Sequence, residues 1–350
     1  MKVLVAMSGG VDSSVAAALM KDAGHEVIGV TLKLWSGPNG EAPTAGCCTV
    51  SDAEDARRVA AVLDIPYYVL DYTEEFHAGV VDLFIGDYAS GRTPNPCIEC
   101  NRTVKFDRLL RRLDEFGCDV LVTGHHARTR YIEGTWELLR GADRAKDQSY
   151  VLSMLTQREL DRIRFPVGEY TKAHVRRIAG ELGLRTATKP ESMEICFVGN
   201  GDYREFLRRN APEVFAPGKL VDTTGNVLGE HRGIVDFTVG QRRGLGIPAI
   251  GEPRYVVRID AATNTVVLGG RQDLEVSEIE LVQLTGTNGQ FPHGEVLAQY
   301  RAHGEAVEAV LDGTTVHFAA PQKAIAPGQT VAFYHDERVI GGALIASAGL

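Results

Sequence analysis

The chain has 350 residues, of which 44% are hydrophobic and 24% are charged, values typical of a soluble globular protein with two or three domains. Its 37 Lys and Arg residues against 46 Asp and Glu residues give a formal net charge of −9, which excludes a basic coat over the whole surface but not one basic face. No apolar run is long enough to span a membrane, and Met1-Lys2 leads directly into a predicted strand. We therefore expect a cytoplasmic protein without a membrane partner.

The first predicted strand, residues 3–7, leads into the motif Ser-Gly-Gly-Val-Asp-Ser-Ser at residues 8–14 and then into an apolar-periodic helix. Paired glycines permit a tight turn, and serine hydroxyls at a helix N-terminus favour a bound phosphate. The loop lacks the Gly-Lys-Ser/Thr ending of the Walker motif, so it offers no lysine to the phosphates. It resembles the PP-loop of ATP pyrophosphatases, and the alternative is an ordinary glycine-rich turn of a doubly wound protein.

Strand and helix signals alternate over residues 1–125. Strands are predicted at residues 26–35, 67–70 and 120–123, and helices at residues 51–63, with Ser51 as N-cap, 74–90 and 103–116. This alternation predicts a parallel sheet built from βαβ units. Two prolines predict a loop at residues 91–101. Because ligands gather at the carboxyl ends of parallel strands, we expect Ser8, this loop and Gly124-His125 on one rim.

The later part of the chain changes character twice. Residues 126–205 are predicted to be mainly helical, with Thr171 capping a helix at 172–182 and a cysteine-containing loop at 189–197. Beyond about residue 210, short strands alternate with Gly, Asn and Asp turns. We therefore predict an α/β fold: a doubly wound parallel sheet over 1–205 that binds ATP, a central β-rich domain over 206–275, and a C-terminal barrel-like domain over 276–350.

Six cysteines suggest redox, catalytic or metal chemistry in a cytosolic chain, and they lie at positions 47, 48, 97, 100, 118 and 196. Two loop cysteines far apart in sequence suggest a nucleophilic pair. A zinc site formed by Cys97 and Cys100 with Cys47 and Cys48 is an alternative, although adjacent cysteines lack the usual ligand spacer. Cys118 is expected in the core, and Cys47 and Cys48 are left between loop packing and a redox role.

With these motifs the chain resembles the bacterial tRNA-specific 2-thiouridylase family of PP-loop ATP pyrophosphatases. The likeness rests on segments that span nearly the whole chain in the family's order, namely residues 6–14, 93–96, 100–101, 105–106, 123–125, 146–150, 195–197, 237–246 and 326–329. The resemblance implies ATP-dependent 2-thiolation of the wobble uridine of tRNA. The C2 oxygen would be adenylated and sulfur would come from a persulfide on Cys196, with Cys100 as the partner nucleophile.

The resemblance also implies a nucleotide site with Mg²⁺ on the triphosphate and no resident metal of the protein. Asp12 would act in catalysis by organising the metal-bound triphosphate. The nucleotide contacts implied by the family are Ala6, Met7, Ser8, Gly9, Gly10, Val11, Asp12, Ser13, Leu32 and Gly124. AMP and pyrophosphate would leave, and a Cys100–Cys196 disulfide would remain for an external reductant.

The implied partners are the anticodon stem-loop of tRNA and a sulfur donor, either a cysteine desulfurase or a relay carrier. The implied tRNA contacts are Asn95, Pro96 and Cys97 at the target base, and His125, Lys146, Asp147, Gln148, Gln299, Tyr300 and Gln329 elsewhere. Two positions depart from the family. Cys97 stands where several relatives have an aspartate cast as an acid/base helper, and Gln299 stands where relatives usually have arginine, which weakens that contact.

Basic residues are expected to gather on the substrate face because tRNA is polyanionic. The candidates are Arg102, Lys105, Arg108, Arg111, Arg112, Arg128, Arg130, Lys146, Arg208 and Arg209. Helical spacing places Lys105, Arg108 and Arg112 near one face, and a merely solvated face is the alternative. Two other functions remain open here: a PP-loop synthetase with a small-molecule acceptor, and a non-catalytic RNA-binding protein.

Overall fold

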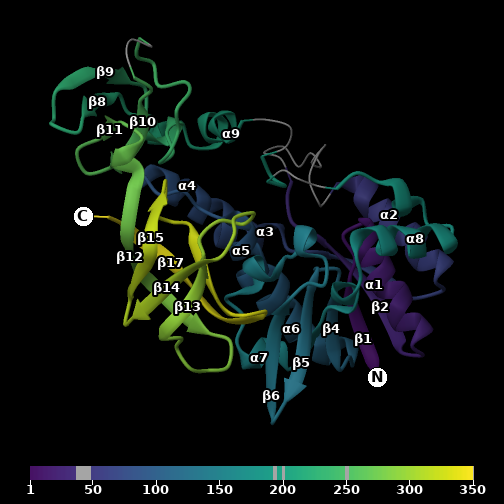
Figure 1. Ribbon diagram of the computed structural model, residues 1–350. Coiled ribbons are helices and arrows are strands. Elements are labelled where there is room, and N and C mark those ends of the chain that lie inside the picture. The colour runs from purple at the N-terminus through teal and green to yellow at the C-terminus, as the bar shows by residue number, and fades with distance from the viewer. Residues whose placement is uncertain (37–48, 192–194, 199–201, 249–251, 350) are drawn as a thin grey trace.

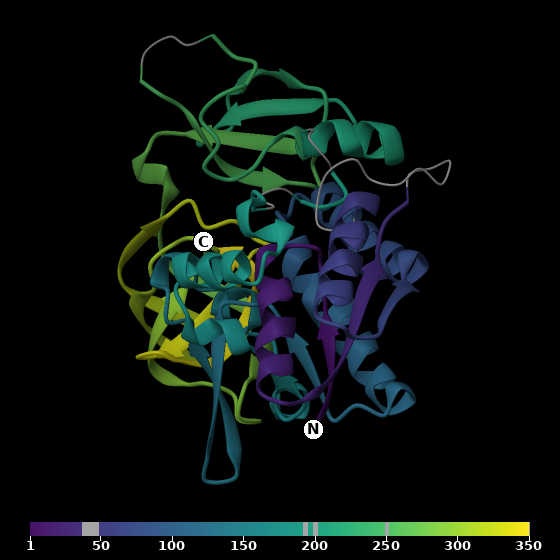
Figure 2. The same ribbon diagram turned by 90° about the vertical axis from the view of Figure 1, so that its right-hand side faces the viewer.

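The computed structural model describes residues 1–36, 49–191, 195–198, 202–248 and 252–349. Figures 1 and 2 show three parts: a parallel sheet with its helices, a small sheet set apart from it, and a β-barrel beside the first part. In the described residues, no helix is both long and apolar enough to cross a bilayer.

The N-terminal sheet is parallel throughout and has the order β3-β2-β1-β4-β7. Its strands are β1 (Lys2–Ala6), β2 (Glu26–Lys33), β3 (Tyr67–Asp71), β4 (Val120–Thr123) and β7 (Ile163–Arg164). Side chains alternate along β1, with Leu4 in one hydrophobic cluster and Val3 and Val5 in another. Both faces of the sheet are therefore buried, as in a doubly wound fold, and the predicted fold class is confirmed.

Helices cover the two faces. On the side of Val3 and Val5 lie α1 (Val11–Asp22), α2 (Val50–Val62) and α8 (Lys172–Glu181). On the other side lie α3 (Thr73–Phe76), a π turn (His77–Val81), α4 (Asp82–Ala89) and α6 (Asp107–Phe116). Thr171 caps α8 as predicted, but Ser51 does not cap α2. Thr49 does so instead, because its hydroxyl and the Asp52 carboxylate form a reciprocal capping box, which leaves Ser51 inside the first turn.

A helix begins at Pro96, contrary to the prediction of a loop through residue 101. Helix α5 (Pro96–Glu99) continues through a π turn (Cys100–Phe106) into α6. Pro96 occupies the first helical position, where its missing N–H costs no helical hydrogen bond, and the Asn95 side chain caps this end by accepting from the Ile98 N–H. Both cysteines of this segment therefore lie on a helix.

Residues 127–140 form a hairpin, in a region predicted to be mainly helical. Strands β5 (Ala127–Ile132) and β6 (Thr135–Arg140) pair across a turn in which Glu133 and Gly134 have φ angles of 50° and 84°. β6 also pairs with β17 of the C-terminal barrel, with Leu139 opposite Arg338. The remaining elements of this region are α7 (Gln157–Leu160) and the 3₁₀ turns Arg144–Lys146, Ser149–Leu152, Pro166–Glu169 and Arg185–Thr188.

The last part of the chain contains the two β modules expected from its turn punctuation. After α9 (Tyr203–Asn210), a four-stranded sheet has the order β10-β11-β8-β9, formed by β8 (Gly218–Asp222), β9 (Val227–His231), β10 (Tyr255–Asp260) and β11 (Thr265–Gly269). The barrel strands are β12 (Glu275–Gly286), β13 (Gly294–Gln299), β14 (Val307–Asp312), β15 (Thr315–Lys323), β16 (Thr330–His335) and β17 (Arg338–Ala348). β12 pairs with both β15 and β17, so the barrel is closed. The domain boundaries given above stay predictions.

The barrel braces the start of the cysteine-bearing helix. The Thr93 N–H donates to the Pro327 carbonyl oxygen at 2.8 Å, and Gln329 Nε2 donates to the carbonyl oxygens of Thr93 and Pro94 at 2.8 and 3.2 Å. Residues 327 and 329 of the barrel thereby hold residues 93 and 94, which lead into α5.

Candidate active site

The loop at residues 8–14 turns from β1 into α1 and is tied by its own serines. The Ser8 N–H donates to Ser13 Oγ at 3.1 Å, and Ser14 Oγ donates to the Gly10 carbonyl oxygen at 2.8 Å. Gly9 has a φ of +72°, and a Cβ there would lie 2.2 Å from the Asp52 carbonyl oxygen, so only glycine fits. Because Gly10 is the N-cap and has no side chain, the first amides of α1 are left for an anion.

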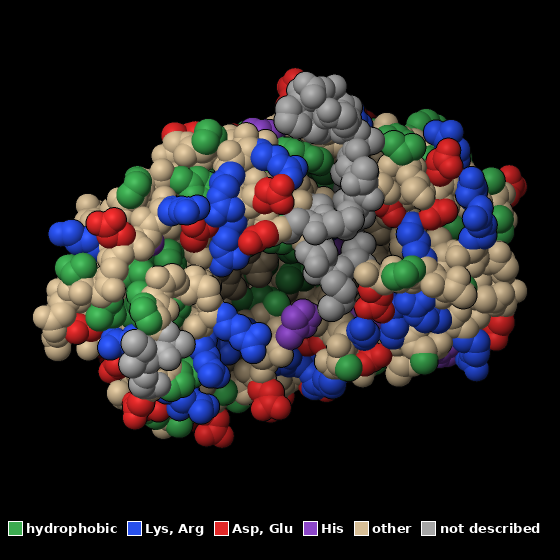
Figure 3. Space-filling model, turned by 90° about the horizontal axis from the view of Figure 1, so that it is seen from above, with side chains coloured by type: hydrophobic (Ala, Val, Ile, Leu, Met, Phe, Trp, Pro, Cys, Tyr) green, Lys and Arg blue, Asp and Glu red, His purple; other side chains and the backbone are tan. Residues whose placement is uncertain are grey.

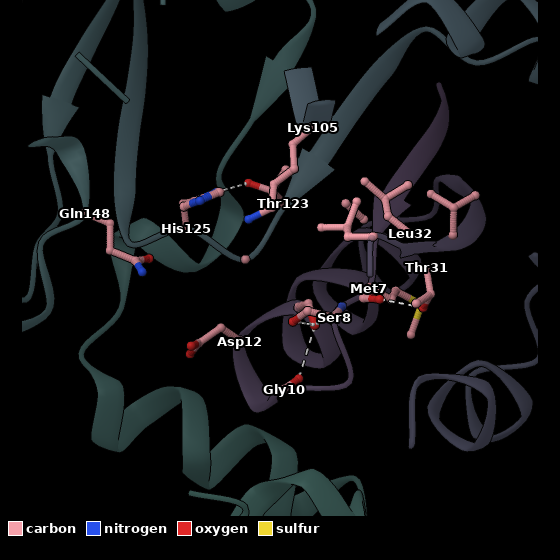
Figure 4. Close-up of a pocket in the computed structure, with 15 residues that line it drawn as sticks. Met7, Ser8, Gly10, Asp12, Thr31, Leu32, Lys105, Thr123, His125 and Gln148 are labelled. Carbon is pink, nitrogen blue, oxygen red and sulfur yellow. Dashed lines mark hydrogen bonds between the residues drawn. The ribbon is translucent and has the colours of Figure 1, made fainter. Parts of the chain in front are cut away.

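A cavity of about 210 Å³ lies beside this loop (Figure 4). Its lining comprises Ala6, Met7, Ser8, Gly10, Asp12, Ser13, Val30, Thr31, Leu32, Leu34, Lys105, Thr123, Gly124, His125 and Gln148. These include every predicted nucleotide-binding residue except Gly9, which packs on Asp52, and Val11, which is buried in the core. Of the predicted rim, Ser8 and Gly124-His125 line this cavity, whereas no residue of the predicted loop at 91–101 does.

His125 lies within this cavity, at the end of β4. Its Nδ1 is 2.7 Å from Thr123 Oγ1, and the rings of Phe106 and Phe165 are each centred 6.0 Å from its own. Burial lowers the pKa of His125 to about 3, and the positive charge of Lys105 acts in the same direction. His125 is therefore neutral at physiological pH, a polar but uncharged part of the cavity wall.

The low pKa of His125 predicts a specific pH dependence of stability. The unfolded chain takes up this proton near pH 6.5, whereas the folded chain does so only near pH 3, so the free energy of unfolding should fall as the pH drops below about 6.5. Urea denaturation of His125→Asn at pH 7.5 and pH 5 should show a smaller loss than wild type. His293→Asn, at an exposed position, is the control and should keep the wild-type difference. Equal losses in His125→Asn and wild type would contradict the assignment.

Asp12 is the carboxylate of the cavity. Its Oδ2 is 2.6 Å from Lys172 Nζ, and its Oδ1 is 3.1 Å from His126 Nε2. Burial acts to raise the pKa of Asp12, but the hydrogen bonds from His126 and Lys172 outweigh it, so the pKa is lowered and the group is ionised. An ionised carboxylate facing a phosphate cradle is the oxygen ligand that Mg²⁺ prefers. In the described residues no cluster of three or more His, Cys, Asp or Glu is arranged to hold a metal ion.

The two predicted nucleophiles pack against a single hydrophobic cluster. Cys100 is buried in it at 6% exposure, and the half-buried Cys196 packs on its edge. Leu32 and Leu34 belong to the same cluster and also line the cavity, so the cluster adjoins the nucleotide cradle.

The residue after Cys196 anchors that segment. The Phe197 ring lies edge-on to Phe76, Phe84 and Phe206, at centroid distances of 5.6, 5.1 and 5.1 Å. Such aromatic packing fixes the chain on both sides of the ring and so restricts where the neighbouring thiol can lie.

Of the other four cysteines, the structure describes Cys97 and Cys118. Cys118 is buried, as predicted, and Cys97 is exposed on α5. Cys47 and Cys48 lie outside the described residues. The zinc site, loop packing and a redox role for these two cysteines therefore stay hypotheses from the sequence.

Comparison with known proteins decides the family. Three family models match successive parts of the chain: a tRNA methyl transferase HUP domain at residues 1–200, a tRNA methyl transferase PRC-barrel domain at 204–270, and an aminomethyltransferase beta-barrel domain at 271–345. The chain is 47% identical to the tRNA-specific 2-thiouridylase MnmA of Roseiflexus sp. (strain RS-1), over 99% of both chains. It is also 47% identical to that of Herpetosiphon aurantiacus, over 99% of this chain and 98% of the relative. The chain belongs to the tRNA-specific 2-thiouridylase family.

Two predicted tRNA contacts are buried in this member of the 2-thiouridylase family. The Asp147 carboxylate accepts from an Arg140 guanidinium N–H at 3.0 Å, from the Gly141 and Ser149 backbone N–H groups at 2.9 and 3.0 Å, and from Ser149 Oγ at 2.9 Å. Gln299 is 4% exposed, and its Oε1 accepts from Arg140 at 3.3 Å. Both side chains accept hydrogen bonds from Arg140, and contact of these two residues with tRNA stays a prediction.

Other predicted tRNA contacts are engaged within the 2-thiouridylase fold. Gln148 lines the cavity and its Oε1 accepts from the His126 N–H at 2.9 Å, while Lys146 pairs with Glu191 at 2.8 Å. The Tyr300 hydroxyl donates to Gln322 at 2.9 Å, and Gln329 holds residues 93 and 94. Contact of these residues with tRNA stays a prediction.

The predicted basic helix face extends over two elements: Lys105 lies in the π turn, and Arg108 and Arg112 lie in α6. Lys105 lines the cavity, whereas Arg112 donates to the Tyr72 hydroxyl at 3.1 Å and pairs with Glu115. Arg108 and Arg112 lie four residues apart within α6, and a face shared with Lys105 stays a prediction. A π turn adds a residue to the turn and rotates what precedes it relative to α6. Many other candidates are paired with carboxylates, including Arg102, Arg111, Arg128, Arg130, Arg208 and Arg209. Figure 3 nevertheless shows Lys and Arg side chains on the rims of a hollow with a hydrophobic floor.

Four charged or titratable residues around the cradle were missed by the sequence reasoning: His126, Lys172, Lys189 and Glu191. Lys189 Nζ donates to the Gly9 carbonyl oxygen at 3.0 Å and pairs with Asp52 and Asp55 at 2.7 and 2.6 Å, which ties the phosphate loop to α2. The sequence signal was weak, because these residues lie far from the loop in the chain. The capped start of α8 was the one available sign that Lys172 begins a helix.

Proposed function

We propose that this protein replaces the C2 oxygen of the wobble uridine of tRNA with sulfur, at the expense of ATP. The observation that carries the proposal is the shared hydrophobic cluster: Cys100 belongs to it, Cys196 packs against it, and two of its members, Leu32 and Leu34, line the cavity beside the phosphate loop. This shared cluster supports an arrangement in which the two thiols act at the activating site, as sulfur transfer requires.

In the proposed reaction the uridine C2 oxygen attacks the α-phosphate of ATP and pyrophosphate leaves. A persulfide on Cys196 then supplies sulfur to C2, either by direct attack or after Cys100 releases it as hydrosulfide, and the adenylated oxygen departs as AMP. Attack of the Cys100 thiolate on the Cys196 sulfur leaves a disulfide, which a two-electron reductant must return to two thiols. Asp12 would hold Mg²⁺ on the triphosphate, and the cation would offset the charge of the leaving pyrophosphate.

The proposal includes the partners. The sulfur reaches Cys196 from a donor protein, a cysteine desulfurase or a relay carrier. The reaction takes place in the cytoplasm, where thiols are kept reduced between turnovers. The choice of tRNA as the acceptor rests on the names of the relatives, which are tRNA-specific 2-thiouridylases.

Thiolation of a wobble-uridine tRNA in vitro tests the proposal, with ATP, Mg²⁺ and a sulfur donor, and with 2-thiouridine read by mass spectrometry. Wild type should form 2-thiouridine, and Cys100→Ser and Cys196→Ser should each reduce it below detection because serine carries no sulfur. Cys118→Ala, which removes a buried thiol elsewhere in the core, should stay active. Full activity in either serine variant would contradict the two-thiol mechanism.

Methyl transfer is a second candidate, because the family model over residues 1–200 is described as a tRNA methyl transferase domain. The same mass spectrum separates the two reactions, since exchange of oxygen for sulfur and addition of a methyl group give different masses. A methylated uridine formed without ATP would favour the second candidate. The relatives' names and the two clustered cysteines favour the first.

A further inference from the structure

The phosphate loop contains no lysine, yet a lysine from elsewhere in the chain reaches it. Lys172 Nζ lies 2.6 Å from Asp12 Oδ2, and Asp12 lines the cavity. Lys172 is only 9% exposed, so its ammonium group has lost most of its contact with water. A buried ammonium group beside a phosphate cradle needs a reason beyond surface solubility.

The position of Lys172 in its helix strengthens this point. It is the first residue of α8, next to the N-cap Thr171, and its N–H donates to Asp143 Oδ2 at 2.9 Å. The first turn of a helix carries the positive end of the helix dipole, so a cation there is unfavourable for the helix itself. The same dipole and the same lysine would together favour an anion.

The two carboxylates that contact Lys172, those of Asp12 and Glu191, each have a further partner. Besides Asp12 it contacts Glu191 Oε1 at 3.1 Å. Glu191 is also paired with Lys146 at 2.8 Å and lies 3.8 Å from Arg176, while Asp12 keeps its hydrogen bond to His126. Each carboxylate therefore retains another partner when Lys172 turns toward a different anion.

The cavity also has two chemically different ends. Figure 4 shows Leu32 on one side and Asp12 with Gly10 and Ser8 on the other, while Lys105 enters the picture from the side opposite Asp12 and Gly10. The apolar end suits an adenine ring, so the phosphates would extend toward Asp12 and hence toward Lys172.

We propose that Lys172 is the phosphate-binding lysine of this site. It neutralises Asp12 and Glu191 when the site is empty, and it donates to the pyrophosphate portion of ATP when the nucleotide is bound. Glu191 is the competing anion that holds Lys172 in the empty site. The proposal rests on the use of ATP in the proposed function and adds the residue that replaces the lysine missing from the loop.

Calorimetric binding of pyrophosphate, ATP and AMP to the full chain tests this. Lys172→Met should weaken binding of pyrophosphate and ATP by about tenfold or more, the size expected for a charge-assisted hydrogen bond, and should change AMP binding less than about twofold. Lys172→Arg should restore part of the pyrophosphate affinity. Arg177→Met, on the exposed face of the same helix, is the matched control and should bind all three ligands like wild type.

A second variant tests the competition without removing the lysine. Glu191→Gln should strengthen pyrophosphate binding by about two- to fivefold, because a neutral amide holds Lys172 less firmly than a carboxylate does. Wild-type pyrophosphate affinity in Lys172→Met, or weaker binding in Glu191→Gln, would overturn the inference. If wild type itself binds neither ATP nor pyrophosphate, the failure lies with the proposed use of ATP and takes this inference with it.

Discussion

Asp147→Ala should lower the free energy of unfolding by about 3 to 5 kcal/mol, the cost of leaving a buried charge without its partner. The Asp147 and Arg140 side chains are 7% and 15% exposed, and they form an ion pair at 3.0 Å. The Arg140 guanidinium also lies 3.6 Å above the centre of the Tyr334 ring. Removing the carboxylate therefore leaves the Arg140 guanidinium without an anionic partner between the β5–β6 hairpin and the barrel.

Urea denaturation without tRNA measures this effect. Glu337→Ala is the matched control, because Glu337 pairs with Arg128 and Arg144 at the same junction but is 51% exposed, and it should cost less than about 1 kcal/mol. If Asp147→Ala gives too little folded protein, Asp147→Asn keeps the acceptor oxygen and should fall between the two. Wild-type stability together with weaker tRNA binding would instead support the sequence prediction that Asp147 contacts tRNA.

Gly124→Ala should weaken ATP binding by about tenfold or more, because it displaces the start of α1. A Cβ at Gly124 would lie 2.5 Å from the Ser13 backbone nitrogen and 2.7 Å from the Asp12 carbonyl carbon. Both are backbone atoms of the phosphate cradle, which cannot move aside as a flexible side chain can, and a shift of even 1 Å misplaces the amides that face the phosphate.

Equilibrium binding of ATP to Gly124→Ala, compared with Gly86→Ala, is the appropriate measurement. Gly86 lies within α4 with nothing within 4 Å of an added Cβ, so alanine there should stabilise the helix by about 0.5 to 1 kcal/mol and leave ATP binding unchanged. Unchanged ATP affinity in Gly124→Ala would show that the close approach of β4 to α1 does not shape the cradle.

The sequence predicted best those features that depend on residues close together in the chain. The loop at residues 8–14 and the alternation of strands and helices predict the parallel sheet, and the rule for strand ends then places Gly124 and His125 beside Ser8. The short strands of the barrel follow from the same kind of evidence, since its turns punctuate the chain regularly. These features depend on residues close together in sequence, so a reader of the chain can find them.

Predictions failed where a distant segment decides the outcome. β5 and β6 are strands partly because β17, at the other end of the chain, supplies an edge for β6 to pair with. No local pattern signals the ion pair of Asp147 with Arg140 or the burial of Gln299, because both depend on Arg140 and Tyr334, which come together from different parts of the fold. The error at Pro96 had another cause: proline excludes a helix interior but favours the first helical position.

The pairing of β6 with β17 bears on the order in which the protein matures on the ribosome. The N-terminal part of the chain, with the parallel sheet, leaves the exit tunnel first. β6 can pair with β17 only after β17 has been synthesised. Until then the hairpin presents an unpaired edge, the kind of surface that recruits other nascent chains. A protein truncated before β17 is therefore expected to be prone to aggregation even though its ATP cradle is complete.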